Sequence, residues 1–138
     1  MYLSERDIIN KLRSEEYFYI ENLTIVSSVW EGNKADLSRW KLGNYFASKE
    51  DAEEYLHFLI ISTKLSNFAK ANNQEIVRNG KKENFILCYL HNLDAIDVRP
   101  CLYENYGTIC FSSEEIARAA VKEIGESELI KYFFKVRK

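Results

Sequence analysis

The chain has 138 residues, of which 46% are hydrophobic and 29% charged, a balance that favours a folded core over disorder. The formal net charge of −2 excludes an overall basic field that would attract nucleic acid. The longest apolar run, residues 58–61, is too short to span a membrane, and the first residues lack the pattern of a secretion signal. The three scattered cysteines, Cys88, Cys101 and Cys110, favour reduced thiols, so we expect a cytoplasmic protein.

The beginning of the chain predicts a short helix followed by three strands. Ser4 is placed to cap a helix within residues 1–15. Residues 17–20 and 23–30 are rich in aromatic and β-branched side chains, which predicts two strands. Residues 37–46 carry apolar side chains that predict a return to the sheet as a third strand.

A long helix is predicted to begin after Ser48 and to end near residue 73, with acidic residues in its first turns. Its apolar side chains lie on two nearly opposite faces. One face carries Ala52, Tyr55, Leu56 and Leu59, and the other carries Phe58, Ile61, Leu65 and Phe68. We expect burial of both faces within the domain, a kink near residues 62–63, or a homodimer through the long helix.

The second half of the chain repeats this order after a polar loop over residues 74–84. Strands are predicted over residues 85–90, 95–103 and 107–111. Residues 112–115 have the pattern of a capping box, and Gly125 is placed to end the helix that follows. Ser127 begins a short helix at the C-terminal end.

A repeated motif supports this division. Residues 46–52 and 111–117 both have the form Phe-x-Ser-x-Glu-x-Ala. The motif is typical of a strand end followed by a capped helix. We therefore expect a single α+β domain over residues 1–138, with two similar β-β-β-α halves (residues 16–74 and 84–134), mainly antiparallel strands, and short N- and C-terminal helices.

Catalytic chemistry has little support in the sequence. His57 and His91 are the only histidines, and no Ser or Cys lies in a recognisable nucleophile motif. Cys88 and His91 are three residues apart, so on a strand they would point to opposite faces and would bind a metal poorly. No glycine-rich phosphate loop is present. We expect no enzymatic activity, no metal site and no cofactor.

Two kinds of binding remain open. Protein binding is suggested by tryptophan and arginine, which often carry interface energy, together with the acidic start of the long helix. These candidate residues are Trp30, Arg39, Trp40, Glu50, Asp51, Glu53 and Glu54. Nucleic-acid binding is the alternative, because Trp40 stands among cations that could contact phosphates while aromatic rings stack on bases. Its candidate residues are Lys41, Arg78, Lys81 and Lys82.

One segment combines a Gly-Asn-x-Phe motif with a capped helix that begins Glu-x-Ala-Glu: Arg39-Trp40-Lys41-Leu42-Gly43-Asn44-Tyr45-Phe46-Ala47-Ser48-Lys49-Glu50-Asp51-Ala52-Glu53. In this pattern the chain resembles small accessory proteins of phages and prophages of low-GC bacteria, a group that includes anti-CRISPR inhibitors. The resemblance covers roughly residues 17–73, with a weaker echo in residues 84–134, and it transfers no catalytic residue. It implies a non-enzymatic protein that binds and inhibits a host defence protein, such as a CRISPR effector. The alternative is a small nucleic-acid-binding or regulatory module.

Overall fold

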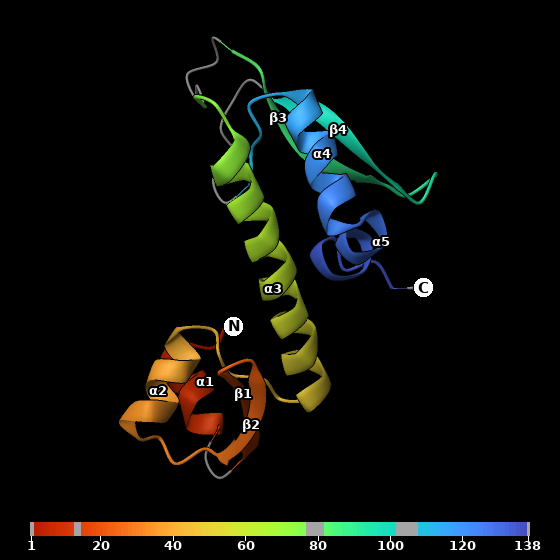
Figure 1. The fold of residues 1–138 in the computed structure, drawn as a ribbon. Coiled ribbons are helices and arrows are strands. Elements are labelled where there is room, and N and C mark those ends of the chain that lie inside the picture. Colours follow the sequence, from red (N-terminus) through yellow and green to blue (C-terminus); the bar gives the residue numbers. More distant parts are fainter. Residues whose placement is uncertain (1, 13–14, 77–81, 102–107, 138) are drawn as a thin grey trace. The chain divides into compact units, whose positions relative to one another are not determined.

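The computed structural model describes residues 2–12, 15–76, 82–101 and 108–137. Its fold is mixed α+β, as expected, with helices and two antiparallel two-stranded sheets (Figure 1). The chain divides into two compact units, residues 1–56 and residues 57–138. The prediction of a single domain stays a prediction.

The first unit contains α1 (Glu5–Lys11), β1 (Glu16–Glu21), β2 (Thr24–Val29), α2 (Lys34–Lys41) and the first turns of α3 (Lys49–Asn72). β1 and β2 pair antiparallel, with Glu21 opposite Thr24. The two residues between them, Asn22 and Leu23, both have positive φ angles, 50° and 63°. A turn of this handedness matches the right-handed twist of the two strands and sets their register.

The predicted third strand over residues 37–46 is wrong, because residues 34–41 form α2. The side chain of Asn33 caps this helix by accepting a hydrogen bond from the main chain of Asp36. Local capping therefore outweighed the aromatic composition that favoured a strand. Phe46 alone pairs with the sheet, through a single antiparallel bridge to Phe18.

The second unit contains the rest of α3, followed by a hairpin, a helix and a compact C-terminal segment. These elements are β3 (Asn84–Leu90), β4 (Ala95–Cys101), α4 (Glu114–Ile124), α5 (Glu126–Glu128) and a π-helical turn, η1 (Leu129–Phe133). Phe111 makes a single bridge to Phe85, and no strand is formed over residues 108–111. The expected β-β-β-α order therefore does not hold, because the third strand is a single bridge in both places.

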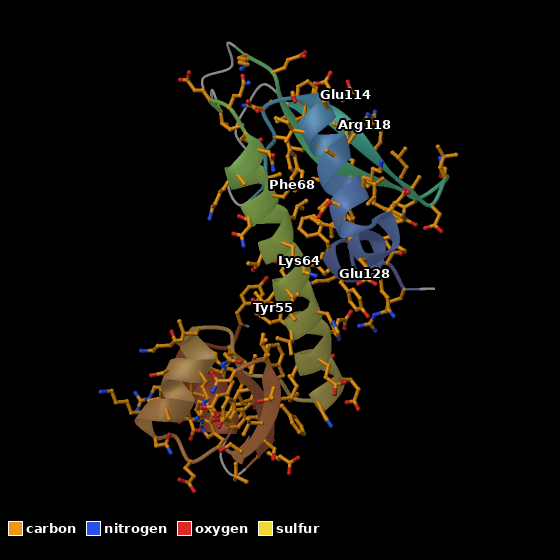
Figure 2. The ribbon with its side chains drawn as sticks, viewed as in Figure 1. Tyr55, Lys64, Phe68, Glu114, Arg118 and Glu128 are labelled. Atoms are coloured by element: carbon orange, nitrogen blue, oxygen red, sulfur yellow. The ribbon has the colours of Figure 1, made fainter. Side chains whose placement is uncertain are left out.

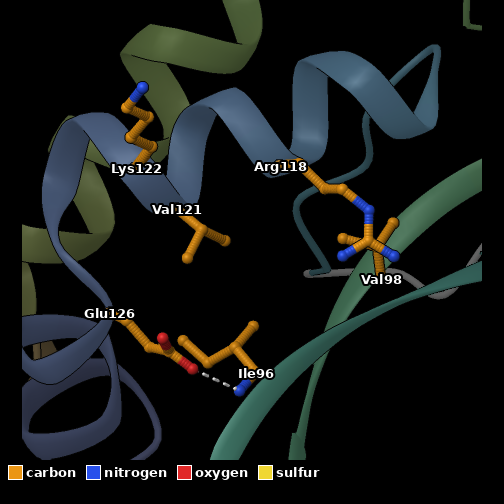
Figure 3. A pocket seen from close by; sticks show the side chains of 6 residues that line it. All are labelled: Ile96, Val98, Arg118, Val121, Lys122 and Glu126. Atoms are coloured by element: carbon orange, nitrogen blue, oxygen red, sulfur yellow. Dashed lines mark hydrogen bonds between the residues drawn. The ribbon is translucent and has the colours of Figure 1, made fainter.

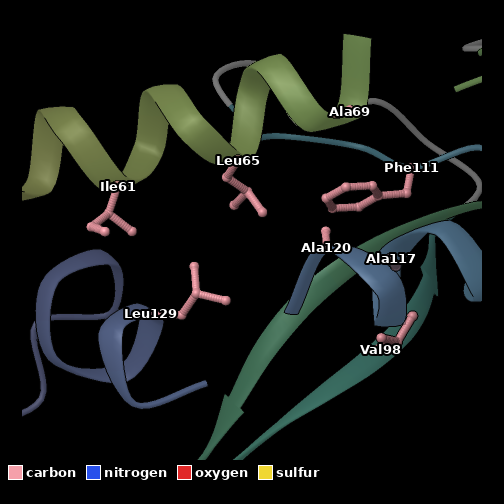
Figure 4. Packing of buried hydrophobic residues seen from close by; sticks show 8 residues of the cluster. All are labelled: Ile61, Leu65, Ala69, Val98, Phe111, Ala117, Ala120 and Leu129. Atoms are coloured by element: carbon pink, nitrogen blue, oxygen red, sulfur yellow. The ribbon is translucent and has the colours of Figure 1, made fainter. Parts of the chain in front are cut away.

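Apolar residues from α3, β4, α4 and η1, together with the bridge residue Phe111, form the core of the second unit (Figure 4). Its buried members are Ile61, Leu65, Ala69, Val98, Phe111, Ala117, Ala120 and Leu129. Ala52, on the other predicted face of α3, is buried in the first unit. Both apolar sets of the long helix thus contribute to burial inside the chain, and the homodimer through this helix stays a prediction.

Candidate functional site

A buried polar cluster joins β1 to α2 in the first unit. The hydroxyl of Tyr17 donates a hydrogen bond of 2.5 Å to Oδ1 of Asp36. Nη1 of Arg39 donates to the same hydroxyl at 2.8 Å and lies 3.7 Å from the carboxylate. The guanidinium of Arg39 also lies 3.7 Å from the ring centroid of Tyr19, in cation–π geometry.

The pKa values in this cluster follow from its burial and its hydrogen bonds. Burial by itself raises the pKa of Asp36, but hydrogen bonds from Tyr17 and from the N–H groups of Glu31 and Gly32 hold that pKa below its usual value. Burial, and then the hydrogen bond to Asp36, raises the pKa of Tyr17. At neutral pH the cluster therefore holds an ionised carboxylate and a protonated tyrosine in fixed positions.

Trp30 belongs to the aromatic packing around this cluster. Its side chain is 1% exposed, and its ring lies edge-on to Tyr17 and Tyr45 at centroid distances of 6.0 and 5.8 Å. The structure therefore places Trp30 in the core, where its ring offers no surface to a partner. The guanidinium of Arg39 is likewise engaged inside the unit, by its contacts with Tyr17, Tyr19 and Asp36.

The other sequence candidates for protein binding lie nearer the surface. Trp40 is half-buried on α2. Glu50, Asp51 and Glu53 are exposed in the first turns of α3, and Glu54 is half-buried. The side chain of Ser48 accepts a hydrogen bond from the N–H of Asp51. The acidic residues thus sit at the positive end of the helix dipole, where they stabilise α3.

Among the sequence candidates for nucleic-acid binding, Lys41 is exposed in the last turn of α2, and Lys82 is exposed just before β3. Arg78 and Lys81 lie outside the described residues.

The outer edge of β1 is closed by the segment that precedes α3. The N–H of Phe18 donates to the carbonyl of Phe46 at 2.8 Å, and the reverse bond is 2.9 Å long. The side-chain amide of Asn44 accepts from the N–H of Ile20 and donates to its carbonyl, at 2.7 and 3.0 Å. This amide therefore satisfies main-chain groups that a further strand would otherwise pair.

The outer edge of β2 is open. The N–H of Trp30 donates to the carbonyl of Glu15, so the main-chain groups of Trp30 face the first strand of the hairpin. In an antiparallel ladder, the main-chain groups of successive residues alternate between facing the neighbouring strand and facing away from it. The main-chain groups of Ile25, Ser27 and Val29 therefore face away from β1. They make no hydrogen bond to any part of the chain that the structure describes. Ser27 is exposed, and Val29 is 51% exposed.

The corresponding edge of the second hairpin is protected. The bridge between Phe85 and Phe111 means that Ile96, Val98 and Pro100 face away from β3. Pro100 has no N–H to offer to an added strand. The N–H of Ile96 is already occupied, because it donates a hydrogen bond of 2.9 Å to the side chain of Glu126 (Figure 3).

Ser27 and Pro100 occupy equivalent positions in the two hairpins. Ser27 is opposite Phe18, which bridges to Phe46, and Pro100 is opposite Phe85. Proline on an outward-facing edge position is a common protection against unwanted strand pairing. The first hairpin lacks this protection at Ser27.

A shallow groove of about 380 Å³ runs between α4 and the protected edge of β4 (Figure 3). It is lined by Ile96, Val98, Arg118, Val121, Lys122 and Glu126. The guanidinium of Arg118 lies 2.7 Å from Glu114, one turn earlier on α4 (Figure 2). It also lies 3.8 Å from the carboxylate of Asp97. The charge of Arg118 is thus balanced within the unit.

The two histidines are placed against aromatic rings. His57 stacks on Tyr132 at 4.5 Å, and His91 lies edge-on to Tyr89 at 4.7 Å, both between ring centroids. Within residues 2–12, 15–76, 82–101 and 108–137, no group of three or more His, Cys, Asp or Glu side chains is placed to hold a metal ion. None of the helices formed by these residues has both the length and the apolar character of a membrane span.

No family model matches the chain, and no curated protein or solved structure is significantly similar to it. The feature that sequence reasoning missed is the open edge of β2. Its signal is the sequence Thr24–Val29, which is rich in β-branched residues and has no charge and no proline, whereas β4 carries Asp97, Arg99 and Pro100.

Proposed function

We propose that this chain is a non-catalytic protein-binding module that captures an extended segment of a partner protein along the outer edge of β2. The observation that carries the proposal is the set of outward-facing main-chain groups on Ile25, Ser27 and Val29. Strand addition to an exposed sheet edge is a common mode of peptide recognition. It requires no catalytic group and no cofactor.

The energetics favour an added strand. A two-stranded hairpin is marginally stable by itself, and a third strand extends both its ladder and its packed faces. Each new main-chain hydrogen bond contributes about 0.5–1.5 kcal/mol net. Since the edge positions are apolar or hydroxylated, we expect the partner strand to carry apolar or Ser/Thr side chains opposite them.

The resemblance to phage and prophage accessory proteins supplies the class of partner that we propose. The partner is a host defence protein, and a CRISPR effector is the first to test. Binding at the edge of β2 would inhibit such a protein by occupying a segment that it needs for its own activity. The acidic start of α3, at Glu50, Asp51 and Glu53, would then serve as a secondary contact, because these side chains are exposed.

The test begins with capture and identification of a host protein from cell lysate on the immobilised chain. Binding of that purified protein is then measured for Ser27→Pro, which removes the outward N–H, and for Ser27→Ala, which keeps it. We expect Ser27→Ala to bind like the parent chain and Ser27→Pro to lose at least tenfold in affinity. Equal binding by the two variants would contradict strand addition at β2. Binding of RNA or DNA that collapses with added salt would instead favour the nucleic-acid alternative.

A further inference from the structure

The open edge of β2 is complementary to itself. We propose that, in the absence of another partner, two copies of this chain pair antiparallel through β2 and so cover the binding edge. The pairing stands on the geometry of β2 alone, whereas its role as a regulator of partner capture rests on the proposed function.

The register of this pairing follows from which residues face outward. A two-fold axis at Ser27 places Ser27 opposite Ser27 of the second copy. It also places Ile25 opposite Val29 of the second copy, and Val29 opposite its Ile25. Each of these outward-facing pairs exchanges two main-chain hydrogen bonds. Shifting the axis to Val26 or Ser28 leaves outward-facing groups of β2 without a partner in the opposite β2, so the register centred on Ser27 is the most favourable.

The side chains agree with the same register. Ile25, Ser27 and Val29 lie on one face of the hairpin, together with Phe18 and Ile20 of β1, to which Ser27 and Ile25 are directly opposed. In the pair, Ile25 meets Val29 of the second copy, which gives the 51% exposed Val29 an apolar neighbour. The result is a four-stranded antiparallel sheet with the order β1-β2-β2-β1.

Charge does not oppose the association. Thr24–Val29 contains no ionisable side chain, so no like charges face each other when the strand meets its copy. β4 differs in all these respects, since Pro100 lacks a donor, Glu126 occupies the N–H of Ile96, and Asp97 and Arg99 are charged. We therefore place the interface between copies in the first hairpin and not in the second.

Self-pairing and partner capture use the same N–H and carbonyl groups, so they exclude each other. A partner strand must displace the second copy before it can pair with β2. Because one strand edge is a small interface, we expect the dimer to dissociate on dilution in the micromolar range. The chain would then be held in a covered state at high concentration and released by dilution or by a tighter-binding partner.

Light scattering coupled to gel filtration, over a series of concentrations, tests the dimer. The parent chain and Ser27→Ala should approach twice the 16.2 kDa of the chain at high concentration, whereas Ser27→Pro should stay at the mass of one chain. Ser27→Lys guards against a folding defect in the proline variant, because it keeps the N–H but places like charges opposite each other. It should also be monomeric. Leu59→Lys, on the exposed part of α3, should remain dimeric, and a monomeric Leu59→Lys would move the interface to the long helix.

Oxidative cross-linking tests the register. Ser27→Cys should form a covalent dimer that reductant reverses. Ser28→Cys, whose main chain pairs with Tyr17, should give no more than the background that the three native cysteines set in the parent chain. A parent chain that is monomeric at every concentration overturns this inference. That result does not affect the proposed partner capture, which is tested separately by the affinities of Ser27→Pro and Ser27→Ala for the partner. A dimer that Ser27→Pro abolishes, with partner binding unchanged, supports this inference and overturns the proposed function.

Discussion

The hydroxyl of Tyr17 lies 2.5 Å from the carboxylate of Asp36, and both side chains are almost fully buried. This contact connects the sheet to α2. Among the residues of this unit that the structure describes, Trp30 is also a large side chain with almost no exposed surface. A buried carboxylate is tolerated only where hydrogen bonds replace its hydration, and Asp36 accepts them from Tyr17, Glu31 and Gly32. The first unit therefore depends on a polar cluster as well as on its apolar contacts.

Asp36→Asn should destabilise the protein strongly. One carboxylate oxygen accepts from two main-chain N–H groups and the other from Tyr17, and an amide that replaces one oxygen by a donor cannot satisfy both sets. We expect a loss of about 2–4 kcal/mol in the free energy of unfolding, measured by urea denaturation. Asp51→Asn, at an exposed position in the first turn of α3, should cost less than about 1 kcal/mol. Equal losses in the two variants would refute a special role for the buried carboxylate.

Acid should weaken the first unit through the same residue. The pKa of Asp36 in the folded protein lies below its ordinary value of 3.8, so folding favours the ionised form. Its contribution is fully present above that ordinary value and is lost as the pH falls through the folded pKa. Thermal unfolding measured from about pH 6 to about pH 2 should show a steeper fall in Tm for the parent chain than for Asp36→Asn. The difference between the two curves separates the effect of Asp36 from that of Asp7, because hydrogen bonds with Ser4 lower the pKa of Asp7 in both proteins. Parallel curves would count against the assignment.

Leu23→Gly should stabilise the first hairpin. Leu23 has a φ angle of 63° and a 71% exposed side chain, so the left-handed conformation is strained and little packing offsets the strain. Asn22 followed by glycine is the preferred sequence for this turn. We expect a gain of about 1 kcal/mol, seen as a rise in Tm. Leu23→Ala removes the exposed side chain but keeps the β-carbon and should give no gain. A gain of the same size from Leu23→Ala would mean that the side chain, and not the backbone, is responsible.

The two Phe-x-Ser-x-Glu-x-Ala motifs should respond alike to overpacking. Ala52 and Ala117 occupy the same motif position and are both fully buried. Leucine at either site should cost about 1–3 kcal/mol, because the surrounding side chains have to move. Ala119→Leu, exposed on α4, should be nearly neutral in the same denaturation assay. A large cost at only one of the two buried sites would show that the motifs are not structurally equivalent.

Much of the local structure could be predicted because it depends on near neighbours. Ser48 was expected to cap the long helix, and its side chain accepts a hydrogen bond from the N–H of Asp51. The capping box expected over residues 112–115 is wrong by one residue, because Ser113 caps α4 by accepting from Ile116, while Ser112 accepts from the N–H of Gln74. The long helix was expected to end near residue 73 and ends at Asn72. In contrast, residues 37–46 were expected to be a strand from their apolar and aromatic side chains, and the helix cap at Asn33 was not recognised.

The candidate site depended on pairings between distant residues, and sequence patterns do not specify these. Arg39 was expected at a surface, but its guanidinium binds Tyr17, which is 22 residues earlier in the chain. The open edge of β2 becomes evident only when the bridge between Phe18 and Phe46 shows which main-chain groups face outward. Strand composition indicated that a strand would form, but not which of its edges would stay unpaired.

The protection of β4 should itself be removable. Pro100 withholds a donor, and Glu126 occupies the N–H of Ile96, so opening this edge requires changing both residues. In a Ser27→Pro background, where β2 is closed, the additional pair Pro100→Ser and Glu126→Ala should produce concentration-dependent self-association in sedimentation experiments. Pro100→Ser combined with Glu128→Ala, which removes a neighbouring carboxylate and leaves Glu126 in place, should remain monomeric. Self-association of this control would show that proline alone keeps the edge closed. A monomeric triple variant with intact helical content would show that the charges of Asp97 and Arg99 are enough to prevent pairing.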